Sequence, residues 1–191
     1  EENWIQWDEV QNLWNERMIE ALAILKSKRI TDKDINTLNE FIALSCYTMI
    51  APRRIKDFSE MKIRNYNEET DNYYDQGQRL FVFNEYKTKN KYGKQVIDIG
   101  ETELPTFLNL WMEINMSDYA LIGERNHDKK LSGSGLTKLL NKIFGKNVSV
   151  NMLRHSFLSN QYKGLDIQKM ENLASQMGHS VSTQMNQYVK K

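Results

Sequence analysis

The sequence has little of what interrupts or cross-links a chain. Its 191 residues include one cysteine, two prolines and nine glycines, so no disulfide can form within the chain and long helices are expected. One cysteine and three scattered histidines give no spacing typical of a zinc site. No apolar run approaches the roughly 20 residues that cross a bilayer, and no signal-peptide pattern opens the sequence. These absences predict an intracellular protein without a membrane span or a bound metal.

Charge is balanced over the whole chain but not along it. The net charge is +1, yet residues 129–191 hold ten basic and two acidic residues, which leaves residues 1–128 with a net negative charge. Charge segregated in this way is typical of a face that binds a polyanion such as DNA. Solvated helix faces that happen to carry lysine would give the same pattern.

Apolar residues recur at three- and four-residue steps over much of the chain, which predicts amphipathic helices. We expect Thr31 or Asp32 to cap the second helix, and Pro52 to begin a short third one. The remaining helices follow Gly100. The predicted helical segments are residues 7–27, 32–46, 52–60, 104–111, 136–144, 151–162, 165–177 and 181–189.

Residues 61–99 have a different pattern. Residues 61–64, 79–86 and 94–99 are predicted to be short strands, the last two joined by a turn, while the polar residues 65–78 are predicted to be a loop. The expected fold is α+β and mainly α, a helical domain with a small three-stranded antiparallel sheet. Residues 1–191 are interpreted as one domain. Because the chain begins with a glutamate, we expect it to be a fragment of a longer protein.

Two short patches in the first half carry candidate catalytic groups. Residues 51–58 contain Arg54, which an acidic residue, Asp57, follows three positions later. Residues 86–89, in the predicted hairpin, contain Lys87.

Two more patches lie near the end of the chain. Residues 151–157 contain Arg154, and residues 177–180 contain His179, which precedes Tyr188 by nine positions. A guanidinium, an imidazole and a phenol are the groups expected where a phosphodiester is attacked by a protein nucleophile.

In this order the four patches resemble those of the tyrosine recombinases, or phage-type integrases, and specifically their C-terminal catalytic domain. The resemblance covers nearly the whole chain. It implies a recombinase-like fold and a site-specific recombinase or integrase of a virus or mobile element, which breaks and rejoins DNA through a 3′-phosphotyrosyl intermediate. The position three residues before Arg154 is usually histidine or lysine in this family, and here it is Asn151. The residues implied as catalytic are Arg54, Lys87, Asn151, Arg154, His179 and Tyr188.

Each residue type suits one part of that reaction. Tyr188 would be the nucleophile, Arg54 and Arg154 would bind the non-bridging phosphate oxygens, and Lys87 would protonate the leaving 5′ oxygen. Asparagine cannot titrate near neutrality, so the usual general base at Asn151 would be replaced by His179 or water. No metal or other cofactor is expected, because protein cations neutralise the phosphate.

Several residue assignments have alternatives. Arg53 competes with Arg54 for the phosphate, and Lys87 competes with two nearby lysines, Lys89 and Lys91. Tyr188 fits the buried stripe of a helix as well as the role of a nucleophile.

The function also has alternatives, a type IB topoisomerase or a helical DNA-binding module without chemistry. Double-stranded DNA is the expected partner in each case, in the cytoplasm or a host nucleus. The resemblance implies a homotetramer on DNA for the full-length protein, whose N-terminal core-binding domain is missing from this chain. We expect the fragment alone to be monomeric.

Overall fold

The computed structural model describes residues 3–162 and 167–178, which form eight helices and four strands. Within those residues, no helix is long and apolar enough to cross a membrane. The predicted helix over residues 181–189 lies outside the described residues. The elements are α1 (Trp7–Leu25), α2 (Asp32–Thr48), α3 (Ile55–Ser59), β1 (Met61–Lys62), β2 (Asn72–Asp75), β3 (Leu80–Phe83), α4 (Lys89–Tyr92), β4 (Gln95–Asp98), α5 (Leu104–Ile114), α6 (Gly133–Phe144), α7 (Val150–Gln161) and α8 (Ile167–Gln176).

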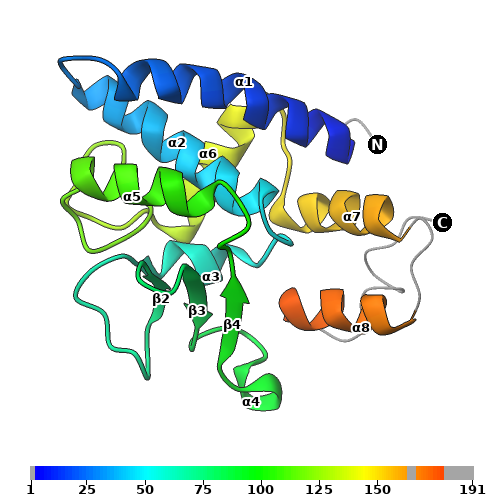
Figure 1. Ribbon diagram of the computed structural model, residues 1–191. Helices are drawn as coiled ribbons and strands as arrows, with labels where there is room; N and C mark the ends of the chain where they lie inside the picture. Colours follow the sequence, from blue (N-terminus) through cyan, green and yellow to red (C-terminus); the bar gives the residue numbers. More distant parts are fainter. Residues whose placement is uncertain (1–2, 163–166, 179–191) are drawn as a thin grey trace.

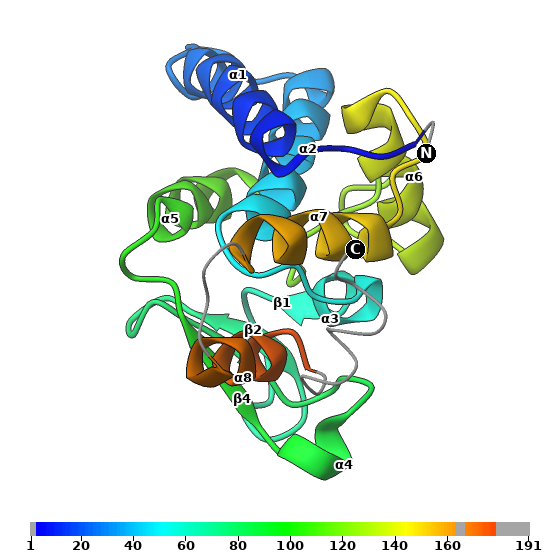
Figure 2. The ribbon, with the colours of Figure 1, turned by 90° about the vertical axis from the view of Figure 1, so that its right-hand side faces the viewer.

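Most of the helices lie above the sheet, while α8 lies beside it and α4 below β4 (Figure 1). Helices α1 and α2 lie along the top, α5 crosses below them, and the sheet forms the lower part of the molecule. Figure 2 shows α7 above α8, with α3 between α6 and the sheet. Aromatic rings join the upper helices: Trp14 contacts Phe41 at 5.6 Å between ring centroids, and Phe41 contacts Phe107 at 4.8 Å. The apolar stripes predicted from the sequence therefore meet in a shared core.

Side chains fix where several helices begin. Thr31, one of the two predicted caps, begins α2: its hydroxyl accepts from the Asp34 N–H at 3.2 Å, and the Asp34 carboxylate accepts from the Thr31 N–H at 2.8 Å. This reciprocal pair satisfies two backbone donors that the helix itself cannot. Ser132 and Ser149 cap α6 and α7 with one bond each: their hydroxyls accept from the N–H groups of Gly135 at 3.0 Å and Met152 at 3.1 Å. Gly145 ends α6 in the left-handed region, at φ 66°.

The sheet differs from the predicted one. It has four strands in the order β1-β2-β3-β4, and β1 pairs with β2 in parallel, so the sheet is mixed rather than three-stranded and antiparallel. Strand β2 lies in the segment predicted to be a loop, where Tyr73 and Tyr74 are buried between polar neighbours. The predicted turn between β3 and β4 contains the short helix α4. Periodicity failed here because strands of two to four residues are too short to show alternation.

Cys46 is expected to resist alkylation in the folded protein. It is buried in α2, and burial raises the pKa of its thiol to about 12. Because the reactive species is the thiolate, iodoacetamide at pH 8.5 should label the native chain far more slowly than the urea-unfolded chain. The thiol ionises more readily in the unfolded state, so this group's contribution to stability is lost as the pH rises above its unfolded pKa. Equal labelling rates, measured by mass spectrometry, would contradict this burial.

Candidate active site

Arg53 and Arg54 are neighbours in the segment that leads into α3, and their side chains lie in different surroundings. Arg54 is the N-cap residue of α3, with an extended backbone at φ −66° and ψ 156°. Arg53 is fully buried, whereas Arg54 is half-buried. Because successive residues of an extended segment point in opposite directions, one of the two faces the core and the other the surface.

The Arg53 guanidinium is packed between the sheet and α8. Its Nε donates to Asp57 Oδ2 at 2.8 Å, and its Nη1 donates to Gln95 Oε1 at 2.9 Å and to the Gln176 carbonyl. It also lies over the Phe83 ring, 4.0 Å from the centroid. Burial raises the pKa of Asp57, an effect that the charge of Arg53 opposes. The acid of the predicted arginine–acid pair thus binds Arg53 rather than Arg54.

Three arginines from two separate segments meet at the end of α8. Arg53 donates to the Gln176 carbonyl, Arg154 Nη2 donates to the Met177 carbonyl at 3.2 Å, and Arg54 Nη1 donates to the Gly178 carbonyl at 3.2 Å. Arg154 projects from α7 and is fully buried. The predicted phosphate ligands Arg54 and Arg154 therefore bind adjacent carbonyls, although they lie far apart in the sequence.

The turn at Gly178 requires glycine. Its φ is +70°, a left-handed conformation that side chains rarely adopt. A Cβ at this position would lie 3.4 Å from Thr88 Oγ1, 3.5 Å from Tyr86 Cδ2 and 3.6 Å from Arg53 Nη2. The chain thus passes close to both Arg53 and the hairpin just before His179.

The lysines of the hairpin differ in their contacts. Lys89 pairs with Glu85, and Lys91 lies over the Tyr92 ring at 5.1 Å. Lys87 is exposed and forms no ion pair within residues 3–162 and 167–178. The neighbouring Thr88 hydroxyl donates to the Gly178 carbonyl at 2.6 Å, so the segment that carries Lys87 contacts the turn that the arginines bind.

Asn151 is an exposed residue in the first turn of α7, one turn before Arg154. His179 and Tyr188 lie outside the described residues. In the part of the chain that the structure describes, no three His, Cys, Asp or Glu residues cluster as metal ligands would.

Asn72 is a further organising residue that the sequence did not reveal. It is buried, and its Nδ2 donates to the carbonyls of Asp57 at 3.1 Å and Glu85 at 2.9 Å. Its Oδ1 accepts from the N–H groups of Asn84 at 2.9 Å and Glu85 at 2.8 Å. All four hydrogen-bonding positions of this amide are therefore used, and they join α3 to the base of the hairpin.

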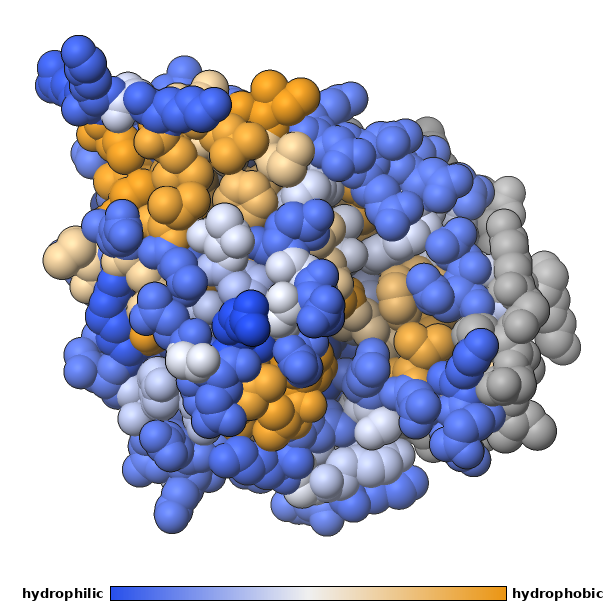
Figure 3. All heavy atoms as spheres, in the orientation of Figure 1, coloured by the Kyte–Doolittle hydropathy of each residue, from blue (hydrophilic) through white to orange (hydrophobic). Residues whose placement is uncertain are grey.

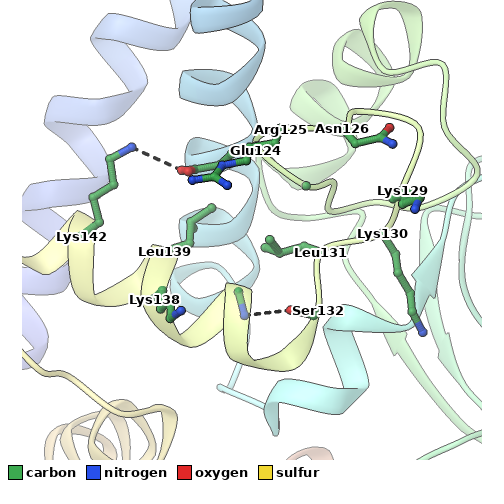
Figure 4. A pocket seen from close by; sticks show the side chains of 12 residues that line it. Glu124, Arg125, Asn126, Lys129, Lys130, Leu131, Ser132, Lys138, Leu139 and Lys142 are labelled. Atoms are coloured by element: carbon green, nitrogen blue, oxygen red, sulfur yellow. Dashed lines mark hydrogen bonds and ion pairs between the residues drawn. The ribbon is translucent and has the colours of Figure 1, made fainter.

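A basic hollow of about 450 Å³ lies between α6 and residues 123–131 (Figure 4). A Cβ on Gly133 would lie 3.2 Å from Ile55 Cγ2, so α6 begins next to α3. Lys130 binds Glu60 and Lys142 binds Glu124, which neutralises part of the hollow's charge. The basic residues that line it are Arg125, Lys129, Lys130, Lys138 and Lys142.

Apolar side chains gather elsewhere, at the upper left of Figure 3, over α1 and α5. Beneath them, Leu25, Phe41 and Trp111 line a small apolar hollow. Apolar side chains offer a phosphate no donors, so this surface is not part of the candidate site.

Comparison with known proteins identifies the fold. No protein-family model matches the chain, and no curated protein matches it. The crystal structure of XerA recombinase, a tyrosine recombinase, is similar, with a TM-score of 0.65 and 16% sequence identity. The chain has a tyrosine-recombinase-like fold. The match covers 98% of this chain and 59% of the XerA chain, and at this identity it establishes the fold alone.

Proposed function

We propose that the chain is the catalytic domain of a site-specific DNA recombinase or integrase that cuts and rejoins strands through a 3′-phosphotyrosyl intermediate. One observation carries the proposal: Arg54 and Arg154, from distant segments, bind adjacent carbonyls at the end of α8, in a fold similar to that of XerA recombinase. Residues 1–191 would form that domain. We include in the proposal a viral or mobile-element source, and a location on DNA in the cytoplasm or a host nucleus.

In this mechanism two guanidinium groups bind the scissile phosphate. A guanidinium has five N–H donors, so a bond from Arg54 to one carbonyl leaves other donors for non-bridging oxygens. Arg154 would meet the same phosphate from α7. Fixed cationic donors act most strongly on the negative charge that develops in the transition state, because they need no reorganisation at that moment.

Tyr188 would attack the phosphorus, forming a P–O bond to its phenolic oxygen while the bond from phosphorus to the 5′ oxygen breaks. The 5′ oxygen leaves as a hydroxyl after taking a proton from Lys87. Lys87 suits this role better than Lys89, because Glu85 already binds Lys89. His179 would bind a phosphate oxygen or accept the phenolic proton, and Asn151 would hydrogen-bond the phosphate without titrating.

The DNA would extend from the arginines over the basic hollow beside α6. Arg125, Lys129 and Lys138 line that hollow and lie exposed on one surface. Cations that neutralise backbone phosphates bind DNA of any sequence, so affinity should fall as salt rises. The proposal includes a homotetramer on DNA for the longer protein and a monomer for this chain in solution.

The test is the capture of a covalent adduct. The chain is incubated with a pool of nicked duplexes of random sequence, in which the broken strand prevents religation, and the products are separated under denaturing conditions. We expect a protein–DNA adduct with a free 5′-hydroxyl, and sequencing its DNA gives the cleavage site. DNA binding without an adduct would indicate a binding module. Relaxation of supercoiled plasmid without strand exchange would indicate a topoisomerase.

A further inference from the structure

The hairpin between β3 and β4 is tied to α8 at two points, one on each side of α4. On one side the Thr88 hydroxyl donates to the Gly178 carbonyl at 2.6 Å. On the other, Gln95 Nε2 donates to the Ser175 carbonyl at 2.7 Å. We refer to Thr88 and Gln95 together as the hairpin clamp. Because both acceptors are main-chain carbonyls at the end of α8, the clamp fixes the hairpin to the turn that precedes His179.

Gln95 connects this clamp to the buried arginine. Its amide oxygen accepts from Arg53 Nη1 at 2.9 Å while its amide nitrogen donates to Ser175. A glutamine side chain satisfied at both ends has one orientation only, since rotating the amide by 180° would oppose donor to donor and acceptor to acceptor. Gln95 therefore links Arg53, β4 and α8.

The base of the hairpin is held separately. Asn72 binds the backbone of Asn84 and Glu85 just before Lys87, and it binds the Asp57 carbonyl in α3. With its base fixed by Asn72 and its outer part fixed by the clamp, the segment around Lys87 is held on both sides. The lysine side chain itself is exposed.

We infer that Thr88 and Gln95 are positioning residues for Lys87: they hold the hairpin against α8 so that the ammonium group reaches the leaving oxygen. This inference rests on the proposed function. Neither residue touches the reacting atoms in this scheme. Each would act through Lys87, and loss of either should slow the protonation of the leaving group rather than the binding of DNA.

A sulfur substitution separates this role from a structural one. In normal DNA the bond between phosphorus and the 5′ oxygen breaks, and the oxygen takes a proton from Lys87. When sulfur replaces that oxygen, the P–S bond breaks and a thiolate leaves without needing the proton, because a thiol has a pKa of about 8.5, far below that of an alcohol. A variant that only misplaces Lys87 is therefore slow on the oxygen substrate and normal on the sulfur substrate.

The experiment compares Thr88→Val, Thr88→Ser and Thr37→Val on the captured cleavage site, made with either oxygen or sulfur at the 5′ bridge. Valine preserves the shape of threonine without its hydroxyl, and serine retains the hydroxyl. Thr37 is the matched control, because its hydroxyl also donates to one backbone carbonyl, that of Lys33 at 3.1 Å, within α2. Rates of adduct formation are measured by stopping the reaction at successive times and quantifying the adduct.

We expect Thr88→Val to cut the oxygen substrate roughly 10-fold to 100-fold more slowly than the unsubstituted chain, and the sulfur substrate at about the same rate. Thr88→Ser and Thr37→Val should match the unsubstituted chain on both. Gln95→Glu, which retains the acceptor for Arg53 but loses the donor to Ser175, should behave like Thr88→Val.

Two results would overturn the inference while leaving the proposed function intact. One is an adduct from the unsubstituted chain with Thr88→Val no slower than Thr37→Val. The other is an equal loss by Thr88→Val on both substrates, because that would show a structural defect and not a misplaced lysine. If the unsubstituted chain forms no adduct at all, the proposed function fails and the positioning role fails with it.

Discussion

Replacing Tyr188 by phenylalanine is expected to abolish the covalent adduct while DNA binding persists. Phenylalanine lacks the oxygen that must bond to phosphorus, so no other property of the side chain can compensate. Removal of a catalytic nucleophile lowers the rate by about 10⁴-fold or more. The measurement is adduct formation on the captured cleavage site, with DNA affinity followed in parallel by fluorescence anisotropy.

Tyr66→Phe is the matched control for this change. Tyr66, in the segment between β1 and β2, stacks on the β2 residue Tyr73, 4.2 Å between ring centroids, and is not one of the predicted site residues. The same loss of one hydroxyl there should leave adduct formation unchanged. An undiminished adduct from Tyr188→Phe would exclude Tyr188 as the nucleophile and direct the search to another hydroxyl.

The second prediction with a large expected effect distinguishes the roles of Arg54 and the adjacent Arg53. Arg54→Met should lower the rate of adduct formation by about 10²-fold to 10³-fold, the loss expected when one donor to the developing phosphate charge is removed. Its free energy of unfolding should change by no more than about 1 kcal/mol, because Arg54 is half-buried and, among the residues that the structure describes, makes one hydrogen bond, to the Gly178 carbonyl.

Arg53→Met, in contrast, should mainly lower the stability of the fold. Arg53 is fully buried and paired with Asp57, so its loss leaves a buried carboxylate without its partner and should lower the free energy of unfolding by about 3–5 kcal/mol. Urea denaturation measures the free energy of unfolding of both variants. If Arg53→Met folds normally but fails to cut, while Arg54→Met cuts normally, then Arg53 is the phosphate ligand and the assignment is reversed.

The helices could be predicted because their signals are local. The apolar stripe of α1 and the Thr31 cap of α2 depend on spacing within a few residues, which the sequence displays directly. Strand β2 could not be predicted in this way. Its buried residues Tyr73 and Tyr74 are adjacent rather than alternating, and Asn72 is polar yet fully buried, because its partners come from α3 and the hairpin.

The candidate site was predictable in part for the same reason. The order of the patches predicted Arg54, Lys87 and Arg154 as site residues, and the structure brings Arg54 and Arg154 to adjacent carbonyls. Spacing could not show which of two neighbouring arginines binds Asp57. In the structure Asp57 binds Arg53, which precedes it by four positions, rather than Arg54, which precedes it by three. No sequence pattern indicated the roles of Thr88 and Gln95, because their partners are backbone atoms at the end of α8, which lies far along the chain.

Five side chains hold the end of α8 through main-chain oxygens: Arg53, Arg54, Thr88, Gln95 and Arg154. Every amino acid provides such an oxygen, so the exposed side chains at positions 175 and 176 can change during evolution without breaking these contacts, whereas Gly178 cannot. An arrangement anchored in this manner tolerates wide divergence of sequence at these positions.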